Sequence, residues 1–226
     1  MDHLLPRPSQ VGRACFLVSE ATLYAALLVL DLSGRSSTPV RYAAICLCAG
    51  TALLLYRRDW LIPLALALTL GADTFLLLRS DHFLLGVLLF CVVQTLYAGR
   101  LTAAAGGRSL LPRLFLFIGA LAVLGALGAL SPLTAASACS FSQLTVNTLQ
   151  ALALRRSIPG GVLLAWGLTL FWCCDLCVGI FNASSFLPAL ALGRLVDLAS
   201  FGMWLFYLPA QVLIVLALWH YPRKKG

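Results

Sequence analysis

The chain contains 226 residues, of which 61% are hydrophobic and 11% are charged, and its formal net charge is +8. A soluble domain carries about 25% charged residues, so this composition excludes an ordinary soluble protein. The apolar residues occur in blocks of about twenty, the helix length that crosses about 30 Å of hydrocarbon. We therefore predict an all-α polytopic membrane protein in which residues 1–226 form a single transmembrane helical domain.

About eight transmembrane helices are expected along the chain. The first apolar segment lacks a small-residue cleavage site after a short apolar region, so we expect it to remain as an uncleaved span. The links between spans are short and rich in Arg, Ser, Gly and Pro, which favours a bacterial plasma membrane over the eukaryotic endoplasmic reticulum. In chain order the expected spans cover about residues 14–31, 40–56, 60–78, 83–103, 110–130, 136–154, 160–181 and 194–219.

The basic residues are distributed unevenly between the two ends of these expected helices. Twelve of the sixteen Lys and Arg residues lie at the amino terminus, in the second, fourth and sixth links and in the tail. Cytoplasmic loops carry the excess of basic residues, so we predict that both termini are cytoplasmic. Because the basic residues cluster at span ends, the positive charge indicates a lipid bilayer and no nucleic-acid partner.

Two aspartates lie deep inside expected spans: Asp73 in LALALTLGADTFLLL and Asp175 in LTLFWCCDLCVGIF. An ionised carboxylate at the centre of a bilayer is unfavourable by about 3 kcal/mol or more. Both residues occur slightly outward of the middle of spans that run in the same direction, so we expect the two carboxyls to lie close together. A protonated carboxyl beside an ionised one supplies an acid and a base. We predict that Asp73 and Asp175 are a catalytic pair.

Other polar residues recur at helical spacing within the spans. In the absence of water such groups need partners, so they should face the interior of the bundle. Two interpretations remain open: hydrogen bonds between helices, each contributing about 0.6 kcal/mol, or contacts with a bound substrate. The sets are Glu20 with Tyr24, Gln94 with Tyr97, the stripe Gln143, Asn147 and Gln150, and the stripe Asp197, Ser200, Trp204, Tyr207 and Gln211.

The cysteine and histidine residues do not form a metal-binding pattern. All eight Cys residues fall within expected spans, where Cys behaves as a small buried hydrophobic residue. Cys173, Cys174 and Cys177 surround Asp175, but Cys174 lies on another helix face and no His is near. None of the three histidines lies in the middle of a span, which counts against a zinc-dependent intramembrane hydrolase. We predict that no residue of the protein binds a metal ion.

Four segments carry a more specific pattern: GADTFLL at 71–77, FLLGVLLFCVVQTLYAGRL at 83–101, GLTLFWCCDLCVGIFNASSF at 167–186 and FYLPAQVLIVLAL at 206–218. Over about residues 60–218 they resemble the YhhN family, which includes the mammalian lysoplasmalogenases, eight-span membrane enzymes of ether-lipid breakdown. Gln94 stands where that family has His, and Gln cannot exchange a proton as His can. Asn182 stands where an acidic residue or Asn follows the second Asp of the family.

The resemblance implies a substrate and a chemistry. The substrate would be a lysoplasmalogen, and its hydrolysis would give a fatty aldehyde and a glycerophospho-alcohol. A vinyl ether needs a proton on carbon and then water, so Asp175 would donate the proton while Asp73 stabilised the positive charge and activated water, or the two roles would be exchanged. No metal or organic cofactor is implied. The candidate substrate-binding residues are Glu20, Gln94, Tyr97, Asn147, Asn182, Tyr207 and Gln211.

Two other classes of membrane protein also place carboxylates in the bilayer. An intramembrane aspartyl protease uses an Asp on each of two helices, and Pro188, Ala189 and Leu190 fit its Pro-Ala-Leu motif. The second Gly before Asp73 and the Tyr before Asp175 are missing, however. A proton-coupled transporter or a non-catalytic lipid-binding protein would also use paired carboxylates. Ether-lipid hydrolysis is therefore the leading hypothesis, and lipid binding or transport is the alternative.

Overall fold

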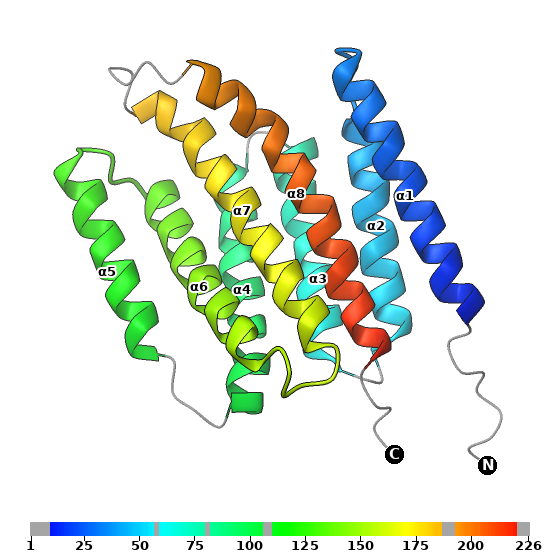
Figure 1. Cartoon of the computed structure of the whole chain (residues 1–226). Coiled ribbons are helices and arrows are strands. Elements are labelled where there is room, and N and C mark those ends of the chain that lie inside the picture. Colours follow the sequence, from blue (N-terminus) through cyan, green and yellow to red (C-terminus); the bar gives the residue numbers. More distant parts are fainter. Residues whose placement is uncertain (1–9, 57–58, 80–81, 106–109, 187–192, 221–226) are drawn as a thin grey trace.

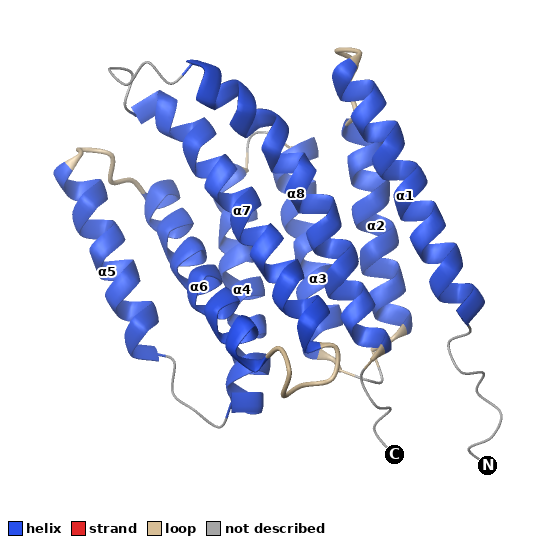
Figure 2. Ribbon diagram, in the orientation of Figure 1, coloured by secondary structure: helices blue, strands red, loops and turns tan. Residues whose placement is uncertain are grey.

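A computed structural model describes residues 10–56, 59–79, 82–105, 110–186 and 193–220. Within these ranges the chain forms eight α-helices and one short π-helix, and no strand (Figure 2). The all-helical class predicted from composition is confirmed. The elements are α1 (Gln10–Leu32), α2 (Thr38–Leu54), α3 (Leu61–Asp73), the π-helix η1 (Thr74–Leu78), α4 (Phe83–Ala105), α5 (Leu110–Ala126), α6 (Pro132–Leu154), α7 (Gly161–Phe186) and α8 (Gly193–Trp219).

Local capping explains two of the differences between the helices and the expected spans. The helix α6 begins at residue 132 rather than 136 because Ser131 and Thr134 form a reciprocal capping box. The Ser131 amide donates to the Thr134 hydroxyl at 2.8 Å, and the Thr134 amide donates to the Ser131 hydroxyl at 3.2 Å. The helix α5 ends at residue 126 rather than 130 because Gly128 has φ +66° and the Ala129 amide bonds back to the Leu124 carbonyl.

The helices form a bundle in which most consecutive helices pack together, while α4 also packs on α6 and α8 returns to contact α2 and α3 (Figure 1). The most extensive contact joins α7 and α8, while α3 packs on α4, α4 on α6, and α6 on α7. A contact of α8 with α3 closes a ring of these five helices, and α1 and α5 lie at opposite edges of the bundle. The start of α1 and the end of α8 lie at one end of the bundle, which we call the terminal end. Both α3 and α7 run away from it.

The described surface of the bundle is strongly apolar, whereas several polar side chains are buried inside it. Phe115 and Leu111 are about 80% exposed, while Glu20, Gln94 and Gln211 are 3% exposed or less. Within the described ranges five segments are long and apolar enough to cross a membrane: α1, α3 with η1, α4, α7 and α8. The shorter helices α2 and α5 are also apolar. This distribution is that of an integral membrane protein.

Pro209 interrupts the hydrogen-bond ladder of α8. Because Pro has no N–H, the carbonyl of Leu205 loses its donor within the helix. The hydroxyl of Tyr24 on α1 donates to this carbonyl at 3.1 Å, so α1 supplies the hydrogen bond that the proline removes. Glu20, one turn earlier on α1, instead accepts a hydrogen bond from the Cys48 thiol of α2 at 3.2 Å. The two polar residues of α1 therefore contact two different helices.

The close approach of α7 and α8 depends on Gly167. A Cβ atom at this position would lie 2.7 Å from Cγ1 of Ile214 and 3.1 Å from the carbonyl oxygen of Ala210. Only Gly allows the two backbones to lie so near each other, as small residues do at many contacts between membrane helices. Since α7 carries Asp175, this contact also fixes the position of Asp175 relative to α8.

We expect the substitution Gly167→Ala to lower the free energy of unfolding by about 1–3 kcal/mol, because the added methyl group overpacks the contact with α8. Thermal unfolding of the purified protein in detergent measures this loss. The matched control is Gly179→Ala on the same helix, where a Cβ atom meets nothing within 4 Å and Ala has the better helix propensity. Equal stability of the two variants would contradict this explanation of the contact.

Candidate active site

Asp73 is the last residue of α3, at the point where the α-helix changes into η1. Its carboxyl is buried, and its Oδ2 atom accepts a hydrogen bond of 2.5 Å from the hydroxyl of Tyr207. The next residue, Thr74, donates to the Leu70 carbonyl at 2.8 Å and lies 3.0 Å from the Tyr42 hydroxyl of α2. Short π-helical turns occur frequently at functional sites. The junction is therefore held both by its own helix and by α2.

The ring of Tyr207 is held by aromatic neighbours. It packs edge-on against Phe171 of α7 and Trp204 of α8, each with a centroid separation of 5.6 Å. The guanidinium of Arg41 lies over the Trp204 ring, 4.3 Å from its centroid, and is paired with Asp31 at 2.9 Å. Such edge-on and cation–π contacts restrict the ring orientation, so the Tyr207 hydroxyl is held toward Asp73.

Asp73, Asp175 and Tyr207 line a single cavity of about 120 Å³ between α3 with η1, α4, α7 and α8. Asp175 is partly exposed, and Val178, three residues farther along α7, is 38% exposed, so the cavity reaches the outer surface of the bundle there. The other lining residues are Leu76, Leu77, Phe90, Phe171, Cys174, Met203 and Trp204.

A mostly apolar cavity with a few converging polar groups is typical of a small-molecule site. The polar groups here are two carboxyls and a phenol, which can donate, accept and transfer protons. No three His, Cys, Asp or Glu side chains come together as metal ligands anywhere in the described part of the chain. The arrangement is therefore suited to acid–base chemistry on a small, largely apolar group.

Several lining residues were not among the candidates derived from the sequence. Phe171 and Val178 precede and follow Asp175 by four and three residues, so all three lie on one face of α7. This spacing could have predicted that Phe171 and Val178 lie beside Asp175. Phe90 and Leu76 lie in uniformly apolar segments, where no pattern separates them from residues that face lipid. Only the tertiary structure identifies them, because the Phe90 ring packs edge-on against Phe171 of α7 and Leu76 lines the same cavity.

Gln94 and Asn147 meet in a buried network outside the cavity lining. The Asn147 amide nitrogen donates to the side-chain oxygen of Gln94 at 3.0 Å and to its backbone carbonyl at 2.9 Å. The Asn147 Oδ1 atom accepts from Arg113 of α5 at 2.8 Å, and Arg113 also donates to Gln150 at 2.8 Å. The polar stripe of α6 thus joins α4 and α5, which supports the interpretation that it holds helices together.

The remaining candidate residues also lie outside the cavity lining. Tyr97 and Gln211 are buried nearer the terminal end, and Glu20 lies beside Cys48 at the contact of α1 with α2. Asn182 is exposed, and its amide donates to the Val178 carbonyl of its own helix at 2.7 Å. Contact of these residues with a substrate stays a prediction. Residues 188–190, the protease-like motif, lie outside the described residues.

The polar stripe expected on the last span is exposed near the start of α8 and buried farther along the helix. Tyr207 and Gln211 are buried, as a stripe facing the interior requires, whereas Asp197 and Ser200 are exposed. The expectation that the whole stripe faces the interior was therefore wrong for its first two members. Most side chains of the first two turns of α8 are exposed, so neighbouring helices do not enclose this part of α8.

We expect Asn147→Leu to lower the free energy of unfolding by about 1–3 kcal/mol, because Arg113 and Gln94 would both lose a buried hydrogen-bond partner. Asn182→Leu is the matched control, since its side chain is exposed and its loss should change stability by no more than about 0.5 kcal/mol. Thermal unfolding of both variants provides the comparison. Similar midpoints would mean that the network around Asn147 does not stabilise the bundle.

Comparison with known proteins identifies the family of the chain. The model of the YhhN family matches residues 37–218, which extends the resemblance seen at about 60–218 toward the amino terminus. No curated protein and no solved structure matches the chain. The family match covers most of the sequence, including both cavity aspartates. The chain therefore belongs to the YhhN family.

Proposed function

We propose that the protein is a membrane-embedded hydrolase that cleaves the vinyl ether bond of lysoplasmalogens. The products would be a fatty aldehyde and a glycerophospho-alcohol. The observation that carries this proposal is that Asp73 and Asp175 line one largely apolar cavity. Membership of the YhhN family supports an ether-lipid substrate, and the two carboxyls supply the acid and base that such a hydrolysis needs.

The size of the cavity suits the reacting group rather than a whole lipid. Pockets that enclose a drug-sized ligand measure about 300–1,000 Å³, whereas this cavity measures about 120 Å³. It reaches the outer surface beside Val178, and that surface is apolar. In this proposal the vinyl ether enters between α7, α8 and η1, while the hydrocarbon chain stays along the lipid-facing surface of the bundle.

The first chemical step is protonation of the double bond. A neutral Asp175 donates its proton to the outer vinyl carbon, the π electrons form the new C–H bond, and an oxocarbenium ion results. Asp73, as a carboxylate, stabilises the positive charge through space. The hydrogen bond from Tyr207 supports this assignment, because Asp73 is the acceptor and the phenol O–H is the donor.

The second step is the addition of water to the oxocarbenium carbon. Asp73 takes a proton from the attacking water, and a hemiacetal forms. In the collapse of the hemiacetal, Asp73 returns that proton to the ether oxygen, the alcohol leaves, and the hydroxyl proton passes to Asp175 as the aldehyde C=O forms. One water is consumed, and both carboxyls return to their starting states.

We also propose that all eight helices cross the bilayer with both termini in the cytoplasm. The excess of basic residues at alternate links supports this orientation, and the start of α1 and the end of α8 lie at the same end of the bundle (Figure 1). A small epitope added to either terminus should be protected in intact cells and accessible only after permeabilisation. An epitope accessible in intact cells would reverse the orientation.

The enzymatic proposal is tested with the purified full chain, a lysoplasmalogen and a saturated lysophospholipid of equal chain length. Only the lysoplasmalogen should release a fatty aldehyde. We expect Asp73→Asn and Asp175→Asn each to lower the rate about 10²–10⁴-fold, since each removes a proton-transfer group. Asp197→Asn is the matched control, because Asp197 is exposed and lies outside the cavity lining, and it should retain the wild-type rate.

Thermal unfolding of each variant shows whether loss of activity reflects loss of folding. A folded wild-type protein that binds lysoplasmalogen but releases no aldehyde would contradict the hydrolase proposal. That result would favour the lipid-binding or transport alternative, for which paired carboxylates also serve. Full activity in a folded Asp175→Asn variant would contradict the assigned proton donor.

A further inference from the structure

A second group of polar side chains lies in the bundle on the terminal side of the cavity. Thr69, Gln94, Tyr97 and Gln211 are each no more than 1% exposed. Within the described ranges, the structure gives no protein hydrogen-bond partner to the Thr69 hydroxyl, the Gln94 amide nitrogen, the Tyr97 hydroxyl or either amide atom of Gln211. We call these four residues the polar layer. Neither the proposed mechanism nor the hydrogen bonds between helices account for these atoms.

Helical spacing places the polar layer next to the cavity. Thr69 precedes Asp73 by one turn on α3, and Gln211 follows Tyr207 by one turn on α8. Since Asp73 and Tyr207 are hydrogen-bonded, Thr69 and Gln211 share a depth about 6 Å closer to the terminal end. Gln94 lies one turn beyond the cavity lining on α4, which also runs toward that end.

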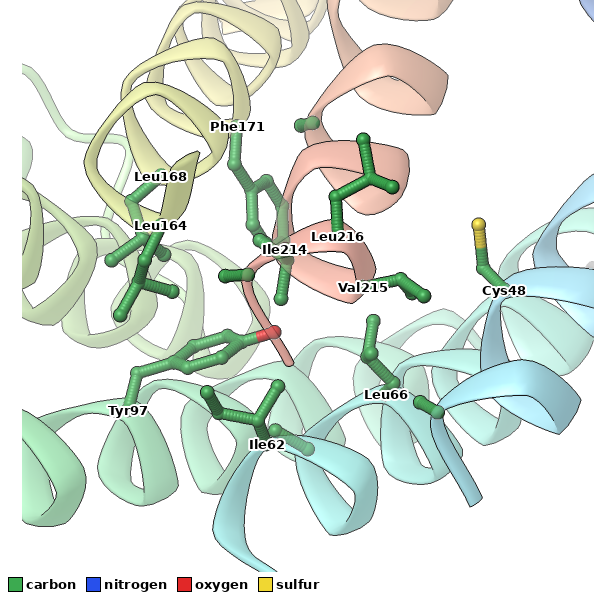
Figure 3. Close-up of a cluster of buried hydrophobic side chains, with 14 of the residues drawn as sticks. Cys48, Ile62, Leu66, Tyr97, Leu164, Leu168, Phe171, Ile214, Val215 and Leu216 are labelled. Atoms are coloured by element: carbon green, nitrogen blue, oxygen red, sulfur yellow. The ribbon is translucent and has the colours of Figure 1, made fainter. Parts of the chain in front are cut away.

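Tyr97 lies at the terminal side of the layer. Figure 3 shows its ring among buried apolar side chains, including Ile62 and Leu164, with the hydroxyl directed toward α8 near Ile214. Side chains on a helix lean toward its amino terminus, and α4 begins at the opposite end of the bundle. The Tyr97 hydroxyl therefore leans toward the other members of the layer, and apolar side chains pack beneath it.

Buried amide and hydroxyl groups without a partner are unfavourable, and in native proteins such groups are commonly satisfied by enclosed water making about three hydrogen bonds. The polar layer offers both donors and acceptors from α3, α4 and α8. All four side chains are uncharged in their ordinary states, so they suit a neutral ligand rather than an ion. Water is the smallest ligand that can use donors and acceptors of this kind.

We propose that the polar layer binds a small cluster of water molecules and supplies the water consumed at Asp73 and Asp175. The supply role rests on the proposed hydrolase function, whereas the water site does not. The mouth of the cavity opens onto the apolar outer surface of the bundle, where hydrocarbon excludes water. Water for each turnover must then reach the carboxyls from within the protein, and the layer lies one helical turn away.

X-ray radiolytic labelling with mass spectrometry tests the water site, because bound water converts to hydroxyl radicals that modify adjacent side chains. The full chain in lipid nanodiscs is the sample. Tyr97 should be modified about tenfold faster than Phe16, which is similarly enclosed at 4% exposure and packs against Trp219. Modification of Tyr97 no faster than that of Phe16 would overturn the water site.

The double variant Thr69→Val with Gln211→Leu removes polar atoms from the layer at nearly constant volume. If water is bound there, the modification rate of Tyr97 should fall to that of Phe16, and the unfolding midpoint should stay unchanged or fall. A rise in the midpoint would contradict the proposal, because removing truly unsatisfied groups stabilises a protein. Thr69→Ser keeps the hydroxyl and should retain the wild-type labelling, which gives a second variant if the double variant does not fold.

Measurement of aldehyde release distinguishes the binding of water at the polar layer from the supply of that water to the reaction. In the double variant we expect kcat to fall about tenfold with KM unchanged, which is the effect of losing about one hydrogen bond to a reacting water. Unchanged kcat with lost labelling would refute the supply role. Rapid labelling of Tyr97 in a wild-type protein that releases no aldehyde would support the water site while refuting the proposed hydrolase function.

Discussion

The interior of a bilayer contains no water to satisfy polar groups, and this constraint governs the polar interior of the bundle. Each polar group inside must therefore find a partner within the bundle, either another protein group or enclosed water. Tyr207 donates to Asp73, Asn147 joins Gln94 to Arg113, and Tyr24 donates to the carbonyl that Pro209 leaves free. Each of these contacts joins different helices. Polar contacts therefore specify which helices meet, in a protein whose outer surface is apolar.

The cavity follows from the way these contacts combine with close packing. Gly167 brings α7 against α8, so Asp175 and Tyr207 lie on neighbouring helices. The hydrogen bond from Tyr207 then joins α8 to the end of α3, where η1 begins. The carboxyls of Asp73 and Asp175, which are about a hundred residues apart in the sequence, thus line the same small space.

The proposed chemistry and the proposed water layer both follow from the apolar surroundings of the two carboxyls. An apolar cavity strengthens the interaction of a carboxylate with a developing positive charge. The same apolar surroundings exclude the water that hydrolysis consumes. Buried neutral groups such as Thr69 and Gln211 can hold water close to Asp73 without placing another charge in the bundle. Because the polar layer lies one helical turn from the cavity, one bundle can both stabilise the positive charge and supply water.

The sequence by itself determined the helical class, the approximate position of each helix and the two exceptional aspartates, because these depend on local composition and on the cost of a charge in hydrocarbon. The family followed from four short segments, two of which contain Asp73 and Asp175. Helical spacing also placed Phe171 and Val178 on the face of Asp175, although it did not single them out.

Tertiary structure alone decided which partner each polar residue has. Spacing defines a face of a helix but not the neighbour that covers it. The pattern therefore left open whether Asn147 joins helices or contacts a substrate, while the structure pairs it with Gln94 and Arg113. For the same reason it could not distinguish the exposed Asp197 from the buried Tyr207 on one stripe. The physical cause is that these environments arise from contacts between segments far apart in the chain, which no local pattern encodes.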